Sequence, residues 1–260
     1  MRREDLWVTS KLWNTFHRRE HVELACRKTL TDLGLEYLDL YLIHFPISQK
    51  FVPIEVRYPP EWIHDPSAAS PRIELDFVST EETWVAMEAL VEKGLTRRVG
   101  VCNFNVQQLM NMMAFCKIKP YLNQVEIHPL NSQEALVNFC SGVLGIRVTS
   151  FSPLGSPSYV VYNMDRSMGD GLLSEASIKA MASRHGKTAA QVVIRWGVQR
   201  GYSIIPKSNQ LARIKENMNV YDFELSAEEM ETINKMNQNI RFNDPGEFCK
   251  GMGGAIPIYN

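Results

Sequence analysis

The residues best suited to chemistry stand where short apolar runs of the sequence end. Lys11 is the last residue but one of the run LWVTSKL, and His44 ends LDLYLIH two residues before Pro46. A lysine supplies a positive charge, and an imidazole can donate a hydrogen bond or exchange a proton near neutral pH. Taken singly, such a lysine is usually a solvated rim residue and such a histidine a core or loop residue. Their meaning therefore depends on the elements that position them.

Six runs of this kind alternate with helical patterns. The predicted strands span 6–12, 38–44, 98–103, 121–128, 146–152 and 202–208. The predicted helices span 18–33, 80–93, 105–115, 132–141, 174–199, 210–219 and 226–238. Strands that alternate with helices predict a parallel sheet covered by helices, either closed as a barrel or open and doubly wound.

The strand ends favour the barrel. Each run finishes in polar or loop-forming residues, which converge on one mouth in a barrel but spread along an edge in an open sheet. GMGG at 251–254 follows no strand and does not complete the Gly-rich turn of an open nucleotide-binding sheet. Because a closed (β/α)8 barrel needs eight strands, we expect an α/β protein of the TIM-barrel type that lacks its first two βα units in this chain, or a six-stranded variant.

Charge and composition exclude several classes of protein. The chain carries 28 Lys and Arg against 29 Asp and Glu, with no block of like charge, so neither nucleic acid nor a membrane is an expected partner. Five cysteines without a C-x-x-C pair suit reduced thiols, and no apolar run is long enough for a membrane span, so we expect a cytoplasmic protein. Four histidines are expected at the surface, with no metal-spaced cluster: His17, His21, His64 and His185.

Six motifs, in order, resemble the aldo-keto reductases, which are NAD(P)H-dependent carbonyl reductases on a TIM-type barrel. They are VTSKLW, DLYLIHFP, VGVCNFN, NQVEIHP, FSPLGSP and IPKSNQLARIKEN. The stretches KFVPIEVRYPP, RFNDP and IPIYN are most similar to the xylose (aldose) reductase branch. The resemblance covers essentially the whole chain. Lys11 and His44 match the family's catalytic lysine and histidine, while the matching Asp and Tyr would stand upstream of Met1 and are not in this chain.

The resemblance implies reduction of an aldehyde or aldose to the alcohol by hydride transfer. As hydride reaches the carbonyl carbon, a proton must reach the oxygen, and a nearby ammonium lets a tyrosine donate it by lowering the pKa of the phenol. Lys11 would supply that charge, and His44 would donate a hydrogen bond that orients the carbonyl. His128, in EIHP, is interpreted as structural.

The resemblance also implies that residues after later strands hold the nicotinamide. Asn103 and Gln124 match the pair that binds its carboxamide. Cys102 stands where the family generally has Ser, and a thiol is the weaker hydrogen-bond partner, so this contact should be looser. Phe151 would stack on the nicotinamide ring, for which a π face suffices.

The phosphates of the cofactor are assigned to two further segments by the same resemblance. The pyrophosphate would lie under a loop that contains Ser152, Leu154, Gly155 and Ser156. The adenosine 2'-phosphate and the adenine would be held by Lys207, Ser208, Asn209, Arg213, Glu216 and Asn217. This set predicts NADP(H), with NAD(H) as a second candidate.

Substrate contacts are expected from loops over the barrel mouth. Phe45 should form a wall, and Asn243 in RFNDP resembles a residue that touches a sugar hydroxyl in the xylose-reductase branch. The whole chain is expected to form one barrel domain, with loops 45–79 and 156–171 over the mouth and a tail at 239–260. The partner would be a small-molecule carbonyl compound, and family members are mostly monomers or dimers.

Two hypotheses stay open at this point. The first is a carbonyl reductase of the xylose or aldose type. The second is a non-catalytic chain that binds NADP or a partner protein. The missing tyrosine, which would donate the proton, decides between the two hypotheses. Its loss is expected to lower the reaction rate by several orders of magnitude.

Overall fold

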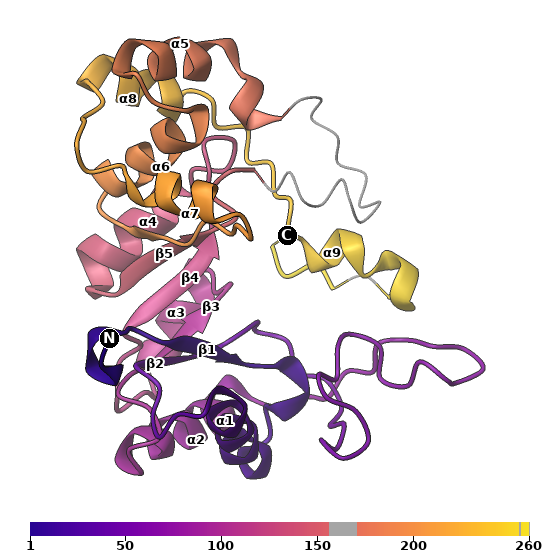
Figure 1. Ribbon diagram of the computed structural model, residues 1–260. Helices are drawn as coiled ribbons and strands as arrows, with labels where there is room; N and C mark the ends of the chain where they lie inside the picture. Colours follow the sequence, from indigo (N-terminus) through magenta and orange to yellow (C-terminus); the bar gives the residue numbers. More distant parts are fainter. Residues whose placement is uncertain (156–170, 255, 260) are drawn as a thin grey trace. The chain divides into compact units, whose positions relative to one another are not determined.

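A computed structural model describes residues 1–155, 171–254 and 256–259. Within these residues one sheet has six strands in the order β1-β2-β3-β4-β5-β6, so neighbours in the sequence are neighbours in the sheet (Figure 1). They are β1 (Thr9–Leu12), β2 (Leu40–Ile43), β3 (Val99–Cys102), β4 (Leu122–Glu126), β5 (Arg147–Phe151) and β6 (Ser203–Ile204). The pairs β1–β2, β2–β3 and β5–β6 are parallel. The expected α/β class is confirmed.

Helices follow the strands along the chain. They are α1 (Arg19–Leu33), α2 (Thr80–Glu92), α3 (Val106–Met113), α4 (Glu134–Asn138), α5 (Ala176–His185), α6 (Ala189–Gln199), α7 (Leu211–Met218), α8 (Ala227–Asn234) and α9 (Pro245–Phe248). Two helices begin at capping residues. Ser79 accepts a hydrogen bond from the Glu82 N–H before α2 (3.1 Å), and Ser226 and Glu229 cap α8 reciprocally.

Two predicted helices differ from the structure. The pattern over 174–199 forms α5 and α6 rather than one helix, because Gly186 takes a left-handed φ of 62° that ends α5. Thr188 and Gln191 then cap α6 reciprocally. The helix predicted over 132–141 is α4, which continues as a π-helix over Phe139–Leu144.

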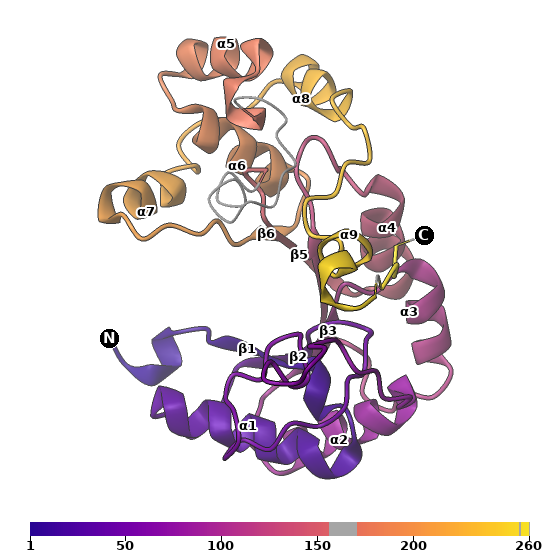
Figure 2. The same ribbon diagram turned by 90° about the vertical axis from the view of Figure 1, so that its right-hand side faces the viewer.

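Internal contacts divide the chain into two compact units. The first joins Met1–Asn123 to Asp244–Asn260. In it, α1 and α2 lie side by side along one face of β1 and β2 (Figures 1 and 2). Buried side chains of these helices, such as Cys26 on α1 and Trp84 and Met87 on α2, form its core.

The second unit is Gln124–Asn243, where α5, α6 and α8 pack together (Figure 1). Trp196 on α6 is buried, and its Nε1 donates a hydrogen bond to Asn234 Oδ1 on α8 (2.9 Å). By contrast, α7 contributes no buried residue. Of the predicted 2'-phosphate-binding residues, Lys207, Ser208 and Asn209 precede this helix, and Arg213 lies in its first turn. They therefore stand on or beside a lightly packed element.

Two general properties bear on the predicted class. Among the residues that the structure describes, none of the helices combines the length and apolar character that a membrane span requires. All five cysteines are free thiols, and four of them are buried.

Candidate active site

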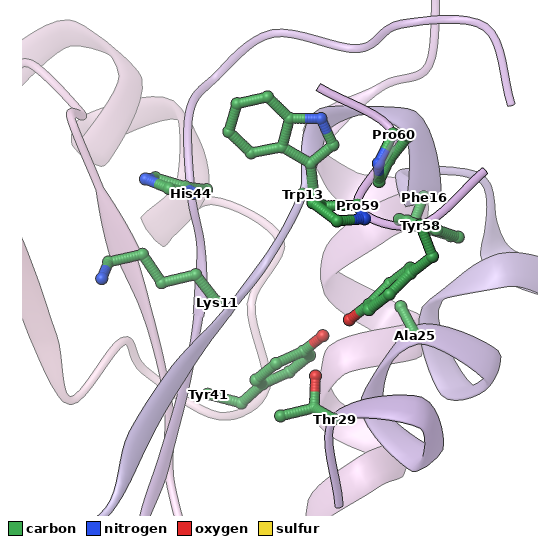
Figure 3. Close-up of a pocket in the computed structure, with 10 residues that line it drawn as sticks. All are labelled: Lys11, Trp13, Phe16, Ala25, Thr29, Tyr41, His44, Tyr58, Pro59 and Pro60. Carbon is green, nitrogen blue, oxygen red and sulfur yellow. The ribbon is translucent and has the colours of Figure 1, made fainter. Parts of the chain in front are cut away.

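Lys11 and His44 lie on one face of two neighbouring strands. Lys11 is paired with Leu42 across β1 and β2, and the His44 N–H donates to Leu12 O just beyond the end of β2 (3.0 Å). Side chains alternate between the faces of a strand, so Lys11 and His44 share a face and Tyr41 takes the other. Figure 3 shows the Lys11 ammonium and the His44 imidazole extending to the same side. The structure therefore brings the predicted catalytic pair together.

The His44 ring has an aromatic, largely buried setting. It lies edge-on to Trp13, with 5.1 Å between ring centroids, and stacks on Phe45 at 4.9 Å. Burial, reinforced by the charge of Lys11, lowers the pKa of His44 to about 3. The imidazole is therefore neutral at pH 7, and its single ring N–H can donate a hydrogen bond without carrying charge.

A pocket of about 140 Å³ is lined by Lys11 and His44 and by two phenols, Tyr41 and Tyr58. It is large enough for a small ring but not for a dinucleotide. In Figure 3 the phenol oxygens face each other near Thr29, on the side of the strands away from the Lys11 ammonium. Burial raises the pKa of Tyr41 well above its usual value. Neither phenol is placed to give a proton to a group beside Lys11.

Asn103 follows β3 in a left-handed conformation, with φ of 65°, and is buried. Its Nδ2 donates to the His44 backbone oxygen (2.9 Å) and to Cys102 Sγ (3.3 Å), and its Oδ1 accepts from the Tyr259 hydroxyl (2.7 Å). Burial raises the pKa of the Cys102 thiol to about 12, so it stays neutral. Asn103 is thus fixed next to His44, partly by a tail residue that the sequence did not suggest.

Phe45 belongs to a chain of four aromatic rings within the first unit. Trp13 lies 5.1 Å from Trp62, Trp62 lies 5.3 Å from Phe45, and Phe248 lies 5.2 Å from Trp62, all between centroids and near edge-to-face. The predicted wall at Phe45 thus includes side chains from loop 45–79 and from α9. Sequence reasoning did not assign Trp13 or Phe248, because their contacts cross long stretches of chain.

In the second unit the residues after β5 form a tight turn. β5 ends at Phe151, Ser152 takes a positive φ of 49°, and the Gly155 N–H donates to Ser152 O (3.1 Å). Gly155 has φ of 74°, and a Cβ there would stand 3.3 Å from the nearest side chain, so glycine suits both the turn and the packing. Leu154 is half-buried in this turn, and Ser156 lies outside the described residues.

Strand β6 is shorter than the predicted span of 202–208. The Ile205 N–H still donates to Ser150 O (3.0 Å), but Pro206 has no N–H with which to continue the ladder. Lys207 and its neighbours therefore stand in a loop before α7 rather than at the end of a strand.

Lys207, Asn209 and Arg213 are exposed around the start of α7. Ser208 Oγ accepts from the Gln210 N–H (3.1 Å), and no side chain caps the first turn of α7. The positive end of a helix dipole and exposed cationic side chains next to it can together bind a phosphate. These residues thus fit the phosphate group predicted for them.

Glu216 and Asn217 stand near the other end of α7. Glu216 Oε1 accepts from Thr188 Oγ1 (2.7 Å), and Glu216 O accepts from Gln191 Nε2 (3.2 Å). Glu216 is therefore tied to the start of α6, whereas Asn217 is half-buried with its side chain outside that contact. If Glu216 binds the adenine as predicted, its second carboxylate oxygen, Oε2, would be the acceptor.

Glu126, at the end of β4, anchors the backbone that carries Asn243. Its Oε1 accepts from the Phe242 N–H (2.7 Å) and its Oε2 from the Asn243 N–H (2.9 Å), while His128 Nε2 lies 3.0 Å from Oε1. Glu126 and His128 are completely buried, and Gln124 is nearly so. This agrees with a structural His128. The anchoring role of Glu126 was missed, although a carboxylate in an all-buried run was a usable signal.

The expectation of a surface role is wrong for His17. It is buried, its Nδ1 lies 3.0 Å from Ser48 Oγ, and burial lowers its pKa to about 4. The loop after β2 folds over it, a long-range contact that local sequence does not reveal. His21 stacks on Phe51, with 3.6 Å between centroids. Within the described part of the chain, no group of three or more His, Cys, Asp or Glu side chains forms a metal site.

The chain matches known proteins over nearly its whole length. The family model described as "Aldo/keto reductase family" matches residues 1–238. A probable NAD(P)H-dependent D-xylose reductase of Arthroderma otae is 44% identical over 260 residues, which cover 100% of this chain and 77% of the relative. The counterpart in Emericella nidulans is 43% identical over 249 residues, 95% of this chain and 76% of the relative.

Solved structures agree with the sequence relatives. An aldose reductase from Giardia lamblia superposes with a TM-score of 0.85 at 37% identity, over 100% of this chain and 80% of the other. A Bombyx mori aldo-keto reductase in complex with NADP gives a TM-score of 0.81 at 35% identity, over 99% and 75% of the two chains.

Proposed function

Because the chain belongs to the aldo/keto reductase family, a family of oxidoreductases, we propose that it reduces an aldehyde or an aldose of the xylose type to the alcohol with NADPH. The observation that carries the proposal is the shared face of Lys11 and His44, whose ammonium and imidazole extend to the same side (Figure 3). When bound, the cofactor supplies a hydride. Every other requirement of the reaction falls to side chains.

In this proposal His44 orients the carbonyl. Its pKa of about 3 keeps the imidazole neutral, so the ring N–H donates to the carbonyl oxygen and stabilises the negative charge that develops there. The Lys11 ammonium lowers the pKa of a tyrosine that acts as the acid. In this proposal that tyrosine is none of those in the matched motifs of this chain. The orientation of Tyr41 and Tyr58 supports this, since both phenols turn away from Lys11 (Figure 3).

We assign the cofactor contacts to the residues that the motifs match. Lys207, Ser208, Asn209 and Arg213 would hold the adenosine 2'-phosphate, which makes NADP(H) the preferred cofactor and NAD(H) the second candidate. Exposed cations beside an uncapped α7 support this. The remaining contacts follow the motifs: Asn103 and Gln124 to the carboxamide, Phe151 to the nicotinamide ring, Ser152, Leu154, Gly155 and Ser156 to the pyrophosphate, and Glu216 and Asn217 to the adenine.

We assign the substrate to Phe45 and Asn243. The aromatic rings around Phe45 would cover the apolar part of an aldehyde, and the Asn243 amide would bind a sugar hydroxyl. The names of the fungal relatives support xylose as the first compound to test. The free thiols suit a reducing compartment, which supports action in the cytoplasm.

The test is product formation from D-xylose and from benzaldehyde with NADPH, using the protein from its natural source with any residues that precede Met1 in place. Alcohol formed in proportion to NADPH oxidised supports the proposal. A higher kcat/KM for xylose supports the role of Asn243, and a preference for benzaldehyde contradicts it. Tight binding of NADPH with no alcohol from either compound would favour the second hypothesis, a protein that binds NADP without catalysis.

A further inference from the structure

The C-terminal tail reaches the residue that we assign to the nicotinamide. The Tyr259 hydroxyl donates a hydrogen bond to Asn103 Oδ1 (2.7 Å), although 156 positions separate the two residues in the sequence. We propose that Tyr259 is a positioning residue for the cofactor: its hydroxyl holds the Asn103 amide in the orientation that receives the nicotinamide carboxamide. This inference rests on the proposed function.

The Asn103 amide is held at both ends. Nδ2 donates to His44 O and to Cys102 Sγ, so the nitrogen side is directed toward β2 and β3. The Tyr259 hydroxyl satisfies one of the two acceptor positions of Oδ1. The second acceptor position is then directed toward any N–H donor that approaches, such as the NH₂ of a carboxamide. Without the hydroxyl, only the weak thiol contact and the bond to His44 O would resist rotation of the amide.

The backbone around Asn103 makes this control effective. Asn103 has φ of 65°, a left-handed conformation that asparagine adopts more readily than most residues with a side chain, and is only 3% exposed. Its side chain cannot swing into solvent to find another acceptor or donor. Its orientation is therefore set by the three partners that the structure gives it, and Tyr259 is the one contributed by the tail.

The tail that carries Tyr259 is itself positioned by contacts within the first unit. Asp244 caps α9 through the Gly246 N–H (2.7 Å), and the Ile256 N–H donates to Pro245 O (3.3 Å). A Cβ at Gly246 would stand 3.0 Å from the capping Asp244 Oδ1 and 3.1 Å from Pro257 Cα. Gly246→Ala is therefore a second way to disturb Tyr259, because it presses on the tail two residues before the phenol and leaves the hydroxyl in place.

The experiment compares two ligands that share one end. NADPH carries both the 2'-phosphate and the nicotinamide, whereas adenosine 2',5'-bisphosphate carries only the 2'-phosphate end. Tyr259→Phe should weaken NADPH binding by about five- to tenfold, the usual worth of one hydrogen bond, and leave the bisphosphate within about twofold. Gly246→Ala should act in the same direction. Tyr221→Phe, at a phenol that is 76% exposed, is the matched control and should change neither ligand.

The other outcomes contradict the inference in distinct ways. Equal weakening of both ligands would mean general loosening of the fold, and tighter NADPH binding would mean that the tail competes with the nicotinamide. Unchanged binding together with unchanged turnover would mean an incidental contact. Lost turnover with unchanged NADPH binding would make Tyr259 a proton donor instead. If the unaltered protein binds neither ligand, the proposed function fails and not merely the role of Tyr259.

Discussion

The two groups of candidate site residues are built in opposite ways. In the first unit, His44 is packed against rings and Asn103 is buried with its amide bonded at both ends. In the second, Lys207 and Arg213 are exposed, one just before and the other on α7, a helix that buries no residue. A group that acts on a reacting bond gains from being fixed beforehand, whereas a group that grips a phosphate can be ordered by the ligand. Substitutions should therefore affect turnover in one region and affinity in the other.

The largest effect should come from removing the charge in the first region. Lys11→Met should lower kcat by about 10²- to 10⁴-fold, because the acid then keeps the high pKa of an ordinary phenol. The dissociation constant for NADPH should stay within about twofold. Steady-state kinetics and a fluorescence titration measure the two, with Lys50→Met, on an exposed ion pair with Glu74, as the control. A fall in affinity as large as that in kcat would remove the contrast between the regions.

Glu126, a buried residue of the second unit, should affect stability as well as substrate binding, unlike the exposed residues of that unit. Glu126→Gln should lower the free energy of unfolding by about 2–3 kcal/mol, because the Phe242 and Asn243 N–H groups lose a charged acceptor. It should also raise KM for xylose more than KM for benzaldehyde, since Asn243 shifts. Denaturant unfolding and the two KM values test this, with the exposed Glu228→Gln as the control. Unchanged stability would show that the anchor contributes little.

Substitution of the exposed phosphate-binding residues should change cofactor affinity alone. Arg213→Ala should weaken NADPH binding by about ten- to a hundredfold, the range for a hydrogen bond to a charged group, and leave NADH binding and thermal stability unchanged. Lys215→Ala, an exposed lysine on the same helix, is the matched control. Equal weakening of NADPH and NADH by the Arg213 substitution would place the 2'-phosphate elsewhere.

A further effect is a dependence of stability on pH that comes from the first region. His17 and His44 have folded pKa values of about 4 and about 3, below the usual 6.5, so the unfolded chain takes up their protons first as the pH falls. Their contribution to stability is complete above pH 6.5 and is lost toward lower pH, at a cost of about 2 kcal/mol for each histidine between pH 7 and pH 5. Unfolding at the two pH values measures it. His17→Gln should show a smaller loss, and an equal loss would contradict the assignment.

The same comparison shows which features of the fold and the site could be predicted from the sequence. The spacing of apolar runs predicted all six strands, and alternation along β1 and β2 explains why Lys11 and His44 share a face. Burial of His17 under the loop after β2, and the reach of Tyr259 to Asn103, depend on contacts between distant segments. No local pattern encodes such contacts, so the partners that hold the first region in place became visible only in the structure.

The measurement that tests the central claim most directly is aldehyde-dependent oxidation of NADPH by the unaltered protein and by His44→Phe, which keeps a ring and removes the N–H. The account predicts a loss of about 10²- to 10³-fold in kcat, the usual cost of removing one donor to a developing oxyanion, with NADPH affinity unchanged. An unaltered kcat in the variant would contradict it, because the carbonyl would then be oriented by some other group.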